Sequence, residues 1–597
     1  MVKGKLTAFL PQLLVLSLLV LGGCVSPRPA VSSSTPDGSL PESTPTDEQN
    51  PSTPEVTPAA SALSSTTPPS ATPEPLPEHR IGVRVVDGEG EFFDRTTGET
   101  FVPRGANYVF VPFRGTLTNL LFKEGVYDPQ RTREDFRTLA ELGYNTVRVF
   151  LDHCSLGPGC ITEPDELDLN RGYLKNIADM TRAAREAGLV ILFTSNDLPD
   201  GGGYAEEANR GSGPDFAGYR NSYYLTEEAV SATQRYWRDL LTGLREQDAA
   251  FEAVLGWQLL NEQWMFIDQP PLSLDSGMVE ITTGSYDLTD PAQKERMVSE
   301  GLIHYIGRVK EEILRHDPTA LVAMGFFVPE LVAPDWYVET ASLLAGSDLD
   351  FFDFHAYPGE FSLEEHAESF GMIGYTRKPI ILGEYGPFRH TYRDLESAAR
   401  VSTEWTTASC QLGFDGWLYW AYYPAPASAG DRTWGLVEED GYLLKLYAPR
   451  NQPDPCTAVD VPRSNLAYGK PVRASRSLPE EPPSRAVDDD PATQWGSGAG
   501  PIQWIEIDLE GLYRISEILL LVSQYPAGET VHRLQVRSTD REAYQTVHEF
   551  SGATAEGDWL VFAPEEPVLD VRQIRIQTVQ SPSWVAWKEI EVSASAP

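Results

Sequence analysis

Basic residues are scarce in this chain of 597 residues. Lysine and arginine total 47 against 87 aspartates and glutamates, which gives a formal charge of −40 at pH 7. Nucleic acids and anionic lipid surfaces attract basic protein faces, so this balance argues against both as electrostatic partners. We therefore expect no nucleic-acid partner, and an acidic surface remains compatible with a neutral substrate.

Cysteines are also few, five in all, and no Cys-x-x-Cys or His-x-His spacing suggests a zinc site. Cys154 and Cys160 flank the turn-rich loop SLGPG, which can bring their sulfurs together, so we expect them to form a disulfide. If Cys24 is acylated, Cys410 and Cys456 are then left for each other by elimination. Export permits both bonds, because thiols are kept reduced only in the cytosol.

Residues 1–24 are too short for a membrane-spanning helix, because Pro11 interrupts their apolar stretch. Two early lysines followed by this stretch are typical of an export signal. Leu21-Gly22-Gly23-Cys24 resembles the bacterial lipobox, which implies a lipid on Cys24 that anchors the protein to the cell membrane, facing the extracellular side. The alternative is an ordinary signal peptide with an incidental cysteine.

Residues 25–80 have almost nothing to bury, since 32 of these 56 residues are Ser, Thr or Pro. Such a composition predicts an extended, disordered linker that holds later domains away from the membrane. The whole chain is 41% hydrophobic and 10% aromatic, which excludes disorder throughout.

Residues 81–455 alternate short apolar runs with amphipathic helical patterns. The candidate strands cover 102–108, 144–150, 189–196, 254–262, 320–327, 350–357, 379–386 and 416–423. Eight strands alternating with helices predict an α/β fold of the (β/α)₈ TIM-barrel type. Residues 81–101 precede them and resemble a hairpin that covers the barrel floor.

Polar and aromatic residues gather where these strands end, and the carboxyl ends of barrel strands share one rim. We expect them to converge on one pocket. They are Arg104, Asn107, Arg148, Asn196, Asp197, Asn261, Glu262, His355, Tyr357, Glu384 and Trp420.

Two of these residues, Glu262 and Glu384, end the fourth and seventh strands and can point at one bond from two sides. This arrangement suits glycoside hydrolysis, in which one carboxylic acid protonates the leaving oxygen and a carboxylate attacks the anomeric carbon. Burial and a neighbouring carboxylate raise the pKa of the acid, and a cation such as Arg148 holds the attacking group ionised. Trp420 can form an apolar floor for a sugar ring.

WQLLNEQ and ILGEYG, with RGAN, Arg148, HAY and the eighth-strand Trp, resemble glycoside hydrolase family 5 over roughly residues 81–450. The resemblance implies a retaining mechanism without a catalytic cofactor, with Glu262 as acid/base and Glu384 as nucleophile. It also implies that Asn261 contacts the sugar 2-hydroxyl, that His355 and Tyr357 position the two glutamates, and that Trp420 floors the sugar subsite.

The third strand departs from many family 5 cellulases, which carry a histidine there. Its end reads FTSNDLPDGGGY, and Asn196 in this position is more similar to the β-mannanase branch. We therefore expect β-1,4-mannan as the substrate, with β-glucan as the alternative.

Each residue also has an ordinary structural interpretation. A single Asn-Glu or Gly-Glu-Tyr-Gly segment means little alone, His355 could be a satisfied structural histidine, and Trp420 could be core packing. Arg104 is expected to be structural and to pair with a barrel carboxylate.

Residues 461–597 change to short alternating strands, which predict an all-β jelly-roll sandwich. The candidate strands cover 504–510, 514–523, 532–538, 572–579 and 587–592. NLAYGKPVRAS, RAVDDDPATQW, IEIDL and WVAWKEIEV resemble the discoidin, or coagulation factor 5/8 type C, domain and the related carbohydrate-binding module family 32. The resemblance implies a structural Ca²⁺ site, for which oxygen ligands are suited. Its ligands would be the carbonyls of Arg485, Asp490 and Lys588 and the side chains of Asp488, Thr493 and Glu589. The alternative is a polar Asx-rich turn without metal.

The sequence thus predicts a surface-anchored retaining glycoside hydrolase that cleaves a β-linked polysaccharide. The alternative is a surface adhesin that binds glycans and has lost activity, although such a protein has no need of both glutamates.

Overall fold

The computed structural model describes residues 78–595 except 211–219, 330–335, 360, 430–431, 460 and 462–463. The predicted signal, Cys24 and nearly all of the predicted linker lie outside the described residues. Within the described part of the chain, no helix is both long and apolar enough to cross a membrane.

A parallel sheet forms the centre of the first domain. Its strands are β3 (Arg104–Asn107), β6 (Thr146–Phe150), β7 (Val190–Thr194), β8 (Val254–Gln258), β12 (Val322–Ala323), β13 (Gly325–Phe326), β15 (Phe352–His355), β16 (Ile380–Tyr385) and β17 (Gly416–Tyr419). They are ordered β12-β8-β7-β6-β3-β17-β16-β15-β13. Because β12 and β13 are two halves of one strand, pairing with β8 and β15 respectively, the sheet closes into the predicted eight-stranded barrel.

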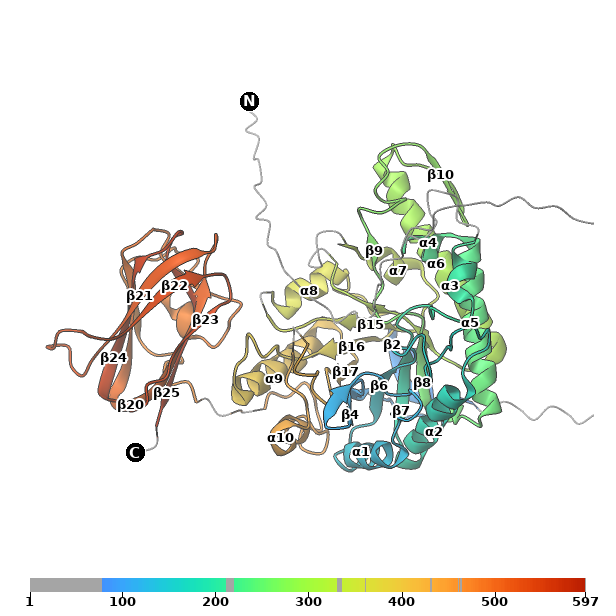
Figure 1. Ribbon diagram of the computed structural model, residues 1–597, viewed down its shortest axis with the longest axis horizontal. Helices are drawn as coiled ribbons and strands as arrows, with labels where there is room; N and C mark the ends of the chain where they lie inside the picture. Colours follow the sequence, from blue (N-terminus) through green and yellow to red (C-terminus); the bar gives the residue numbers. More distant parts are fainter. Residues whose placement is uncertain are drawn as a thin grey trace, which may run out of the picture. The chain divides into compact units, whose positions relative to one another are not determined.

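Helices follow the strands and cover the outside of the barrel, as α1, α2 and α5 do beside β6, β7 and β8 (Figure 1). Their bounds are α1 (Pro129–Glu141), α2 (Arg171–Ala187), α3 (Tyr204–Ala208), α4 (Ser222–Leu225), α5 (Glu227–Glu246), α6 (Pro291–His316), α7 (Ala341–Gly346), α8 (Leu363–Phe370), α9 (Leu395–Leu412) and α10 (Glu438–Leu446). Short antiparallel pairs decorate the loops: β4 (Val111–Phe113) with β5 (Thr116–Thr118), β9 (Met265–Phe266) with β14 (Trp336–Tyr337), and β10 (Met278–Ile281) with β11 (Gly284–Asp287).

Helix α2 illustrates how the sequence sets these boundaries. The side chain of Asn170 accepts hydrogen bonds from the backbone N–H groups of Gly172 and Tyr173, which otherwise lack a partner in the first turn. At the other end Gly188 takes a φ of 76°, the left-handed conformation that glycine adopts without a steric penalty.

The barrel floor is closed by the predicted hairpin, β1 (Ile81–Val86) paired antiparallel with β2 (Glu89–Asp94). Its apolar side chains pack against the first residues of the barrel strands, and this floor cluster includes Ile81, Phe92, Phe101, Val190, Leu192, Leu255, Leu321, Phe351, Ile381 and Leu418. The barrel mouth at the other ends of the strands is left for polar groups.

The barrel domain is slightly longer than predicted at both ends. His79, assigned to the linker, is fully buried, with Nδ1 2.9 Å from the carbonyl oxygen of Val254 and Nε2 2.7 Å from Asp317. Val461, assigned to the second domain, is buried in the main cluster of the barrel. Both His79 and Val461 follow a polar stretch of sequence, and both side chains are buried in the barrel domain.

Both predicted disulfides are present. Cys154 bonds Cys160 across the loop after β6, and Cys410 in α9 bonds Cys456 beyond α10. The second bond ties the end of the barrel domain to its last long helix.

The second domain is an antiparallel sandwich, as predicted. Its strands are β18 (Val472–Ala474), β19 (Trp495–Gly496), β20 (Gln503–Ser523), β21 (Gly528–Arg537), β22 (Gln545–Thr554), β23 (Trp559–Phe562), β24 (Val568–Gln580) and β25 (Ala586–Ala594). The first half of β20 pairs with β18 and β24, and its second half pairs with β23 and β25. One long strand therefore serves both layers around a core that includes Trp495 and Trp587.

Candidate active site

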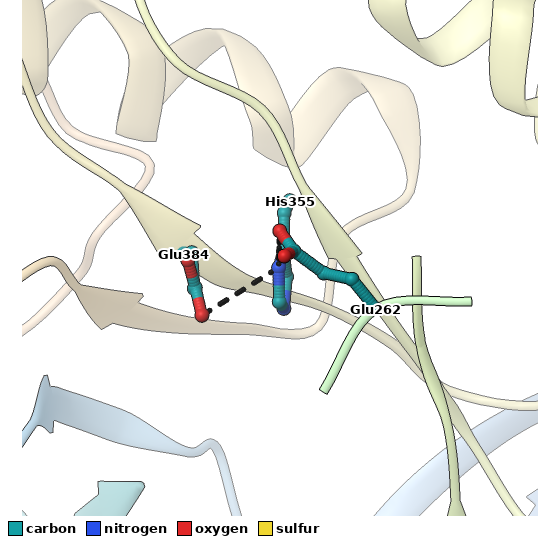
Figure 2. Close-up of side chains that lie close together, drawn as sticks. All are labelled: Glu262, His355 and Glu384. Atoms are coloured by element: carbon teal, nitrogen blue, oxygen red, sulfur yellow. Dashed lines mark hydrogen bonds and ion pairs between the residues drawn. The ribbon is translucent and has the colours of Figure 1, made fainter. Parts of the chain in front are cut away.

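Two glutamates meet at the mouth of the barrel. Glu384 lies in β16, and Glu262 lies four residues after β8; they are 4% and 6% exposed. One oxygen of each carboxylate and a ring nitrogen of His355 all lie within 4.8 Å of one another. In Figure 2 the carboxylate of Glu262 lies over the imidazole of His355, and a dashed line joins that ring to Glu384.

Two donors hold the carboxyl group of Glu384 in place. Nη1 of Arg148 donates to Oε1 at 2.7 Å, and the hydroxyl of Tyr357 donates to Oε2 at 2.7 Å. Arg148 is fully buried in β6 and its charge has no access to water, so its pairing with Glu384 is strong and directional.

Glu262 lies in a different environment. Oε1 accepts a hydrogen bond from Nδ1 of His355 at 2.8 Å, and Oε2 accepts from Nδ2 of Asn261 at 2.9 Å. Burial, opposed by the hydrogen bond from His355 and reinforced by the negative charge of Glu384, raises the pKa of Glu262 to about 7. One glutamate is thus suited to carry a proton near neutral pH while the other is paired with a cation.

Arg148 also organises the surrounding side chains. Its Nη2 donates to Oδ1 of Asn261 at 2.7 Å, its Nη1 to Oδ1 of Asn107 at 3.0 Å, and its Nε to Oε1 of Gln258 at 2.8 Å. The guanidinium therefore links four strands at the rim, and Asn261 bridges it to Glu262.

Trp420 is half-buried at the end of β17. The rings of Phe110 and Phe150 approach it edge-on, each with its centroid 6.1 Å away. Asn196 is also half-buried, and its backbone N–H donates to Asp152 at 2.6 Å; among the described residues its side chain makes no hydrogen bond with either glutamate. Both residues lie at the predicted rim.

Two of the expected rim residues lie elsewhere or act differently. The guanidinium of Arg104 donates to the backbone carbonyls of Gln452 and Tyr447, not to a carboxylate and not into the glutamate group, because its side chain leaves the barrel near the start of β3. Asp197 forms an ion pair with Arg220.

Asp353 and Gln258 belong to the same network although the sequence did not single them out. Asp353 lies in β15 and is fully buried beside Arg148 and His355, and Nε2 of Gln258 donates to it. The signal that reveals them is a polar residue inside an otherwise apolar strand, FFDFH and VLGWQ.

The three donor atoms of Glu262, His355 and Glu384 are close enough to share a metal ion. The guanidinium of Arg148 already occupies one side of Glu384, and His355 directs a ring nitrogen at both carboxylates. A second cation would meet these positive groups, so the arrangement favours proton transfer over metal binding.

The candidate calcium ligands come together in the second domain. The hydroxyl of Thr493 donates to Oδ2 of Asp488 at 2.9 Å and lies 3.2 Å from the carbonyl oxygen of Arg485. The carbonyl of Asp490 accepts from the N–H of Thr493 at 3.0 Å.

Glu589 adds to this cluster a buried carboxyl group with one oxygen that accepts no hydrogen bond from the described residues. It is 2% exposed, and its Oε2 has no hydrogen-bond partner within the described part of the chain. Burial and the charges of Asp489 and Asp488 raise its pKa well above the ordinary value. A buried carboxylate oxygen without a donor fits a hard cation such as Ca²⁺. The side chain of Lys588 pairs with Glu556, which leaves its carbonyl as the relevant group.

The fold and the site define a (β/α)₈ barrel protein with a buried acid pair at its rim, followed by a β-sandwich. Residues 471–590 match the family model of the F5/8 type C domain, which confirms the discoidin-like prediction for the sandwich. No curated protein sequence matches the chain.

Solved structures resemble each domain separately. Exo-beta-1,4-mannosidase Op5Man5 from Opitutaceae bacterium strain TAV5 is 18% identical, with a TM-score of 0.42 and coverage of 62% of this chain and 62% of that one. The beta-mannanase from the blue mussel Mytilus edulis is 14% identical, with a TM-score of 0.38 and coverage of 64% and 99%. Chitosan-binding module 1 from a chitosanase/glucanase of Paenibacillus sp. IK-5 is 24% identical, with a TM-score of 0.20 and coverage of 22% and 100%. The chain spans less than two thirds of the Op5Man5 chain.

Proposed function

We propose that the barrel is a retaining glycoside hydrolase in which Glu262 is the acid/base and Glu384 the nucleophile. The observation that carries this proposal is the pair of buried carboxylates with oxygens within 4.8 Å of each other, one beside Arg148 and the other beside His355. Retaining enzymes place their carboxyl groups about 5–5.5 Å apart, whereas inverting enzymes leave about 6.5–9.5 Å for a water molecule.

The proposed first half-reaction uses both glutamates. An oxygen of Glu384 forms a bond to the anomeric carbon while the glycosidic C–O bond breaks, and the leaving oxygen takes the proton of Glu262. In the second half-reaction Glu262, now a carboxylate, accepts a proton from water as the water oxygen displaces Glu384. Arg148 and Tyr357 hold Glu384 in its attacking orientation throughout.

The substrate we favour is β-1,4-mannan, with β-glucan as the second candidate. The support is the third-strand end, where Asn196 stands in place of the histidine of many family 5 cellulases. Trp420, half-buried and packed edge-on against two phenylalanines, would place its ring under the sugar.

Release of reducing sugar from mannan and a panel of β-glucans tests the proposal. Wild-type protein should hydrolyse at least one, Glu384→Ala none, and Glu365→Gln, which changes an exposed glutamate of α8, should match wild type. If wild type and Glu384→Ala are equally inert while both still bind one polysaccharide, the protein is an adhesin instead.

Proton NMR of the first anomer formed tests the stereochemical course. Retention is expected, and initial inversion would remove Glu384 as the nucleophile. Azide added to Glu384→Ala should restore turnover with an inverted glycosyl azide as product, because a small anion can enter the space that the carboxylate leaves.

We also propose that the protein is exported and anchored through a lipid on Cys24, and that the sandwich binds glycan. The support is the composition of residues 1–24 and, in the sandwich, the exposed aromatic rings of Trp584 and Tyr525, 53% and 70% exposed. Incorporation of a labelled fatty acid into wild type but not into Cys24→Ser tests the anchor.

A further inference from the structure

Asp353 is a buried carboxylate that the two-glutamate reaction does not use. It is fully buried in β15, and its Oδ2 lies 3.0 Å from Nε of Arg148 and 3.4 Å from Nε2 of His355. Nε2 of Gln258 donates to the same oxygen. A carboxylate without water persists in a protein only when cations and donors surround it.

Three acidic side chains surround the imidazole ring of His355. Its Nδ1 lies 2.8 Å from Glu262 and 3.6 Å from Glu384, and its Nε2 faces Asp353. Burial lowers the pKa of His355, but the charges of Glu384 and Asp353 outweigh it and raise the pKa to about 10. Arg148, the other cation of this network, pairs with the same two acids, Asp353 and Glu384.

The strand of the nucleophile leaves room for this aspartate. A Cβ atom on Gly383, the residue before Glu384, would lie 1.6 Å from Oδ1 of Asp353. Any side chain at position 383 would therefore displace the carboxylate of Asp353. Glycine in β16 thus leaves the space that this carboxylate of β15 occupies.

We propose that Asp353 is a positioning residue: it is the counter-ion that keeps His355 an imidazolium and Arg148 in place, so that the charged groups at the rim remain neutral in sum. This inference rests on the proposed glycosidase function and extends it to a third acidic residue.

The charge balance holds through both half-reactions. Before attack, Arg148 and His355 carry one positive charge each, Asp353 and Glu384 one negative charge each, and Glu262 is protonated. After attack Glu384 is a neutral ester and Glu262 a carboxylate, so the sum is again zero. Without Asp353 the same set would carry a net positive charge among largely buried side chains, where an uncompensated charge is costly.

Asp353→Asn tests the proposal through a readout that does not need turnover. We would record ¹⁵N NMR spectra of the histidine rings against pH in the full chain, with the His355 signal assigned by its loss in His355→Gln. Wild-type His355 should remain doubly protonated at pH 8, whereas in Asp353→Asn its pKa should fall by about 1–3 units.

Turnover supplies the second readout. In Asp353→Asn kcat on a soluble substrate should fall by about 100-fold, at the lower end of what general acid–base catalysis contributes, with KM little changed. Asp152→Asn is the matched control, because Asp152 is another buried carboxylate near the rim that binds Ser195 and the backbone of Asn196 but not His355. It should leave the His355 titration unchanged.

A folded Asp353→Asn whose His355 titrates as in wild type, or whose kcat is unchanged, overturns the inference. If Asp353→Asn does not fold, Gly383→Ala displaces the same carboxylate and must lower the pKa of His355. A shifted His355 in a protein inert on every polysaccharide would instead support the counter-ion and overturn the proposed function.

Discussion

At the scale of single residues, two glutamates with the same side chain are given different chemistry by their neighbours. Glu384 receives the guanidinium of Arg148 and the hydroxyl of Tyr357, whereas Glu262 is buried beside another acid with His355 and Asn261 as its donors. Burial is the largest cause of the raised pKa of Glu262. That arrangement costs stability and supplies a proton donor near neutral pH.

The raised pKa of Glu262 predicts a pH-dependent stability. An unfolded glutamate titrates near its ordinary pKa of 4.5 and the folded one near 7, so the folded state loses stability as pH rises through this interval. Glu262→Gln, which cannot ionise, should therefore be more stable than wild type at pH 8 by about 3 kcal/mol, and nearly equal to it at pH 4.

Urea unfolding of both proteins at the two pH values measures this difference. Glu364→Gln, which changes an exposed glutamate on α8, should show a stability difference within about 0.5 kcal/mol at either pH. If Glu262→Gln and wild type are equally stable at pH 8, folding does not raise the pKa of Glu262.

The residue scale also shows where sequence reasoning was sufficient. Glu262, Glu384, His355, Tyr357 and Arg148 were all predicted because polar groups at strand ends meet at one rim. Asp353 was missed because a charged residue inside an apolar strand has no recognisable partner until the barrel closes. Arg104 lies in the predicted strand but points outward, since the first residue of β3 belongs to the outer layer.

At the scale of elements, apolar runs located every barrel strand, because strands buried on both faces are continuously apolar. The sandwich was harder. Strand β22 was missed because most of its side chains are half-exposed or exposed, which gives no apolar pattern. Two predicted strands proved to be one, β20, since the chain continues through Gly511 without a break.

The two disulfides differ in the length of chain they close, and this predicts different contributions to stability. Cys410 and Cys456 are 46 residues apart and Cys154 and Cys160 only 6. Loop-closure entropy gives about 4 kcal/mol for the first bond and about 2 kcal/mol for the second.

Double serine variants of each pair, unfolded in urea under non-reducing conditions, measure the two values and serve as controls for each other. The Cys410 and Cys456 variant should be the less stable protein. The reverse order would show that the Cys154–Cys160 bond contributes more to the free energy of unfolding than the Cys410–Cys456 bond, against the loop-length argument.

At the scale of the whole molecule, the described residues place the candidate active site and the candidate cation site in separate domains. The donor set around Asp488, Thr493 and Glu589 predicts that Ca²⁺ stabilises the sandwich without entering the reaction. At about 100 times its Kd, a ligand that binds only the folded state adds about 2.7 kcal/mol.

Thermal unfolding in Ca²⁺ and in EDTA tests this prediction. Ca²⁺ should raise the Tm of the sandwich transition in wild type and not in Asp488→Asn, while Asp570→Asn, at an exposed aspartate, should respond like wild type. Hydrolysis of a soluble oligosaccharide should be the same in both solutions, and a loss of activity in EDTA would point to a metal at the glutamates.

The burial of His79 has a mechanical consequence under the proposal that a lipid on Cys24 anchors the chain. This residue enters the barrel at the start of β8, against Val254, whereas Glu262 follows the end of the same strand. Under that proposal, any tension on the anchored segment would enter the barrel at its floor, at the opposite end of β8 from Glu262.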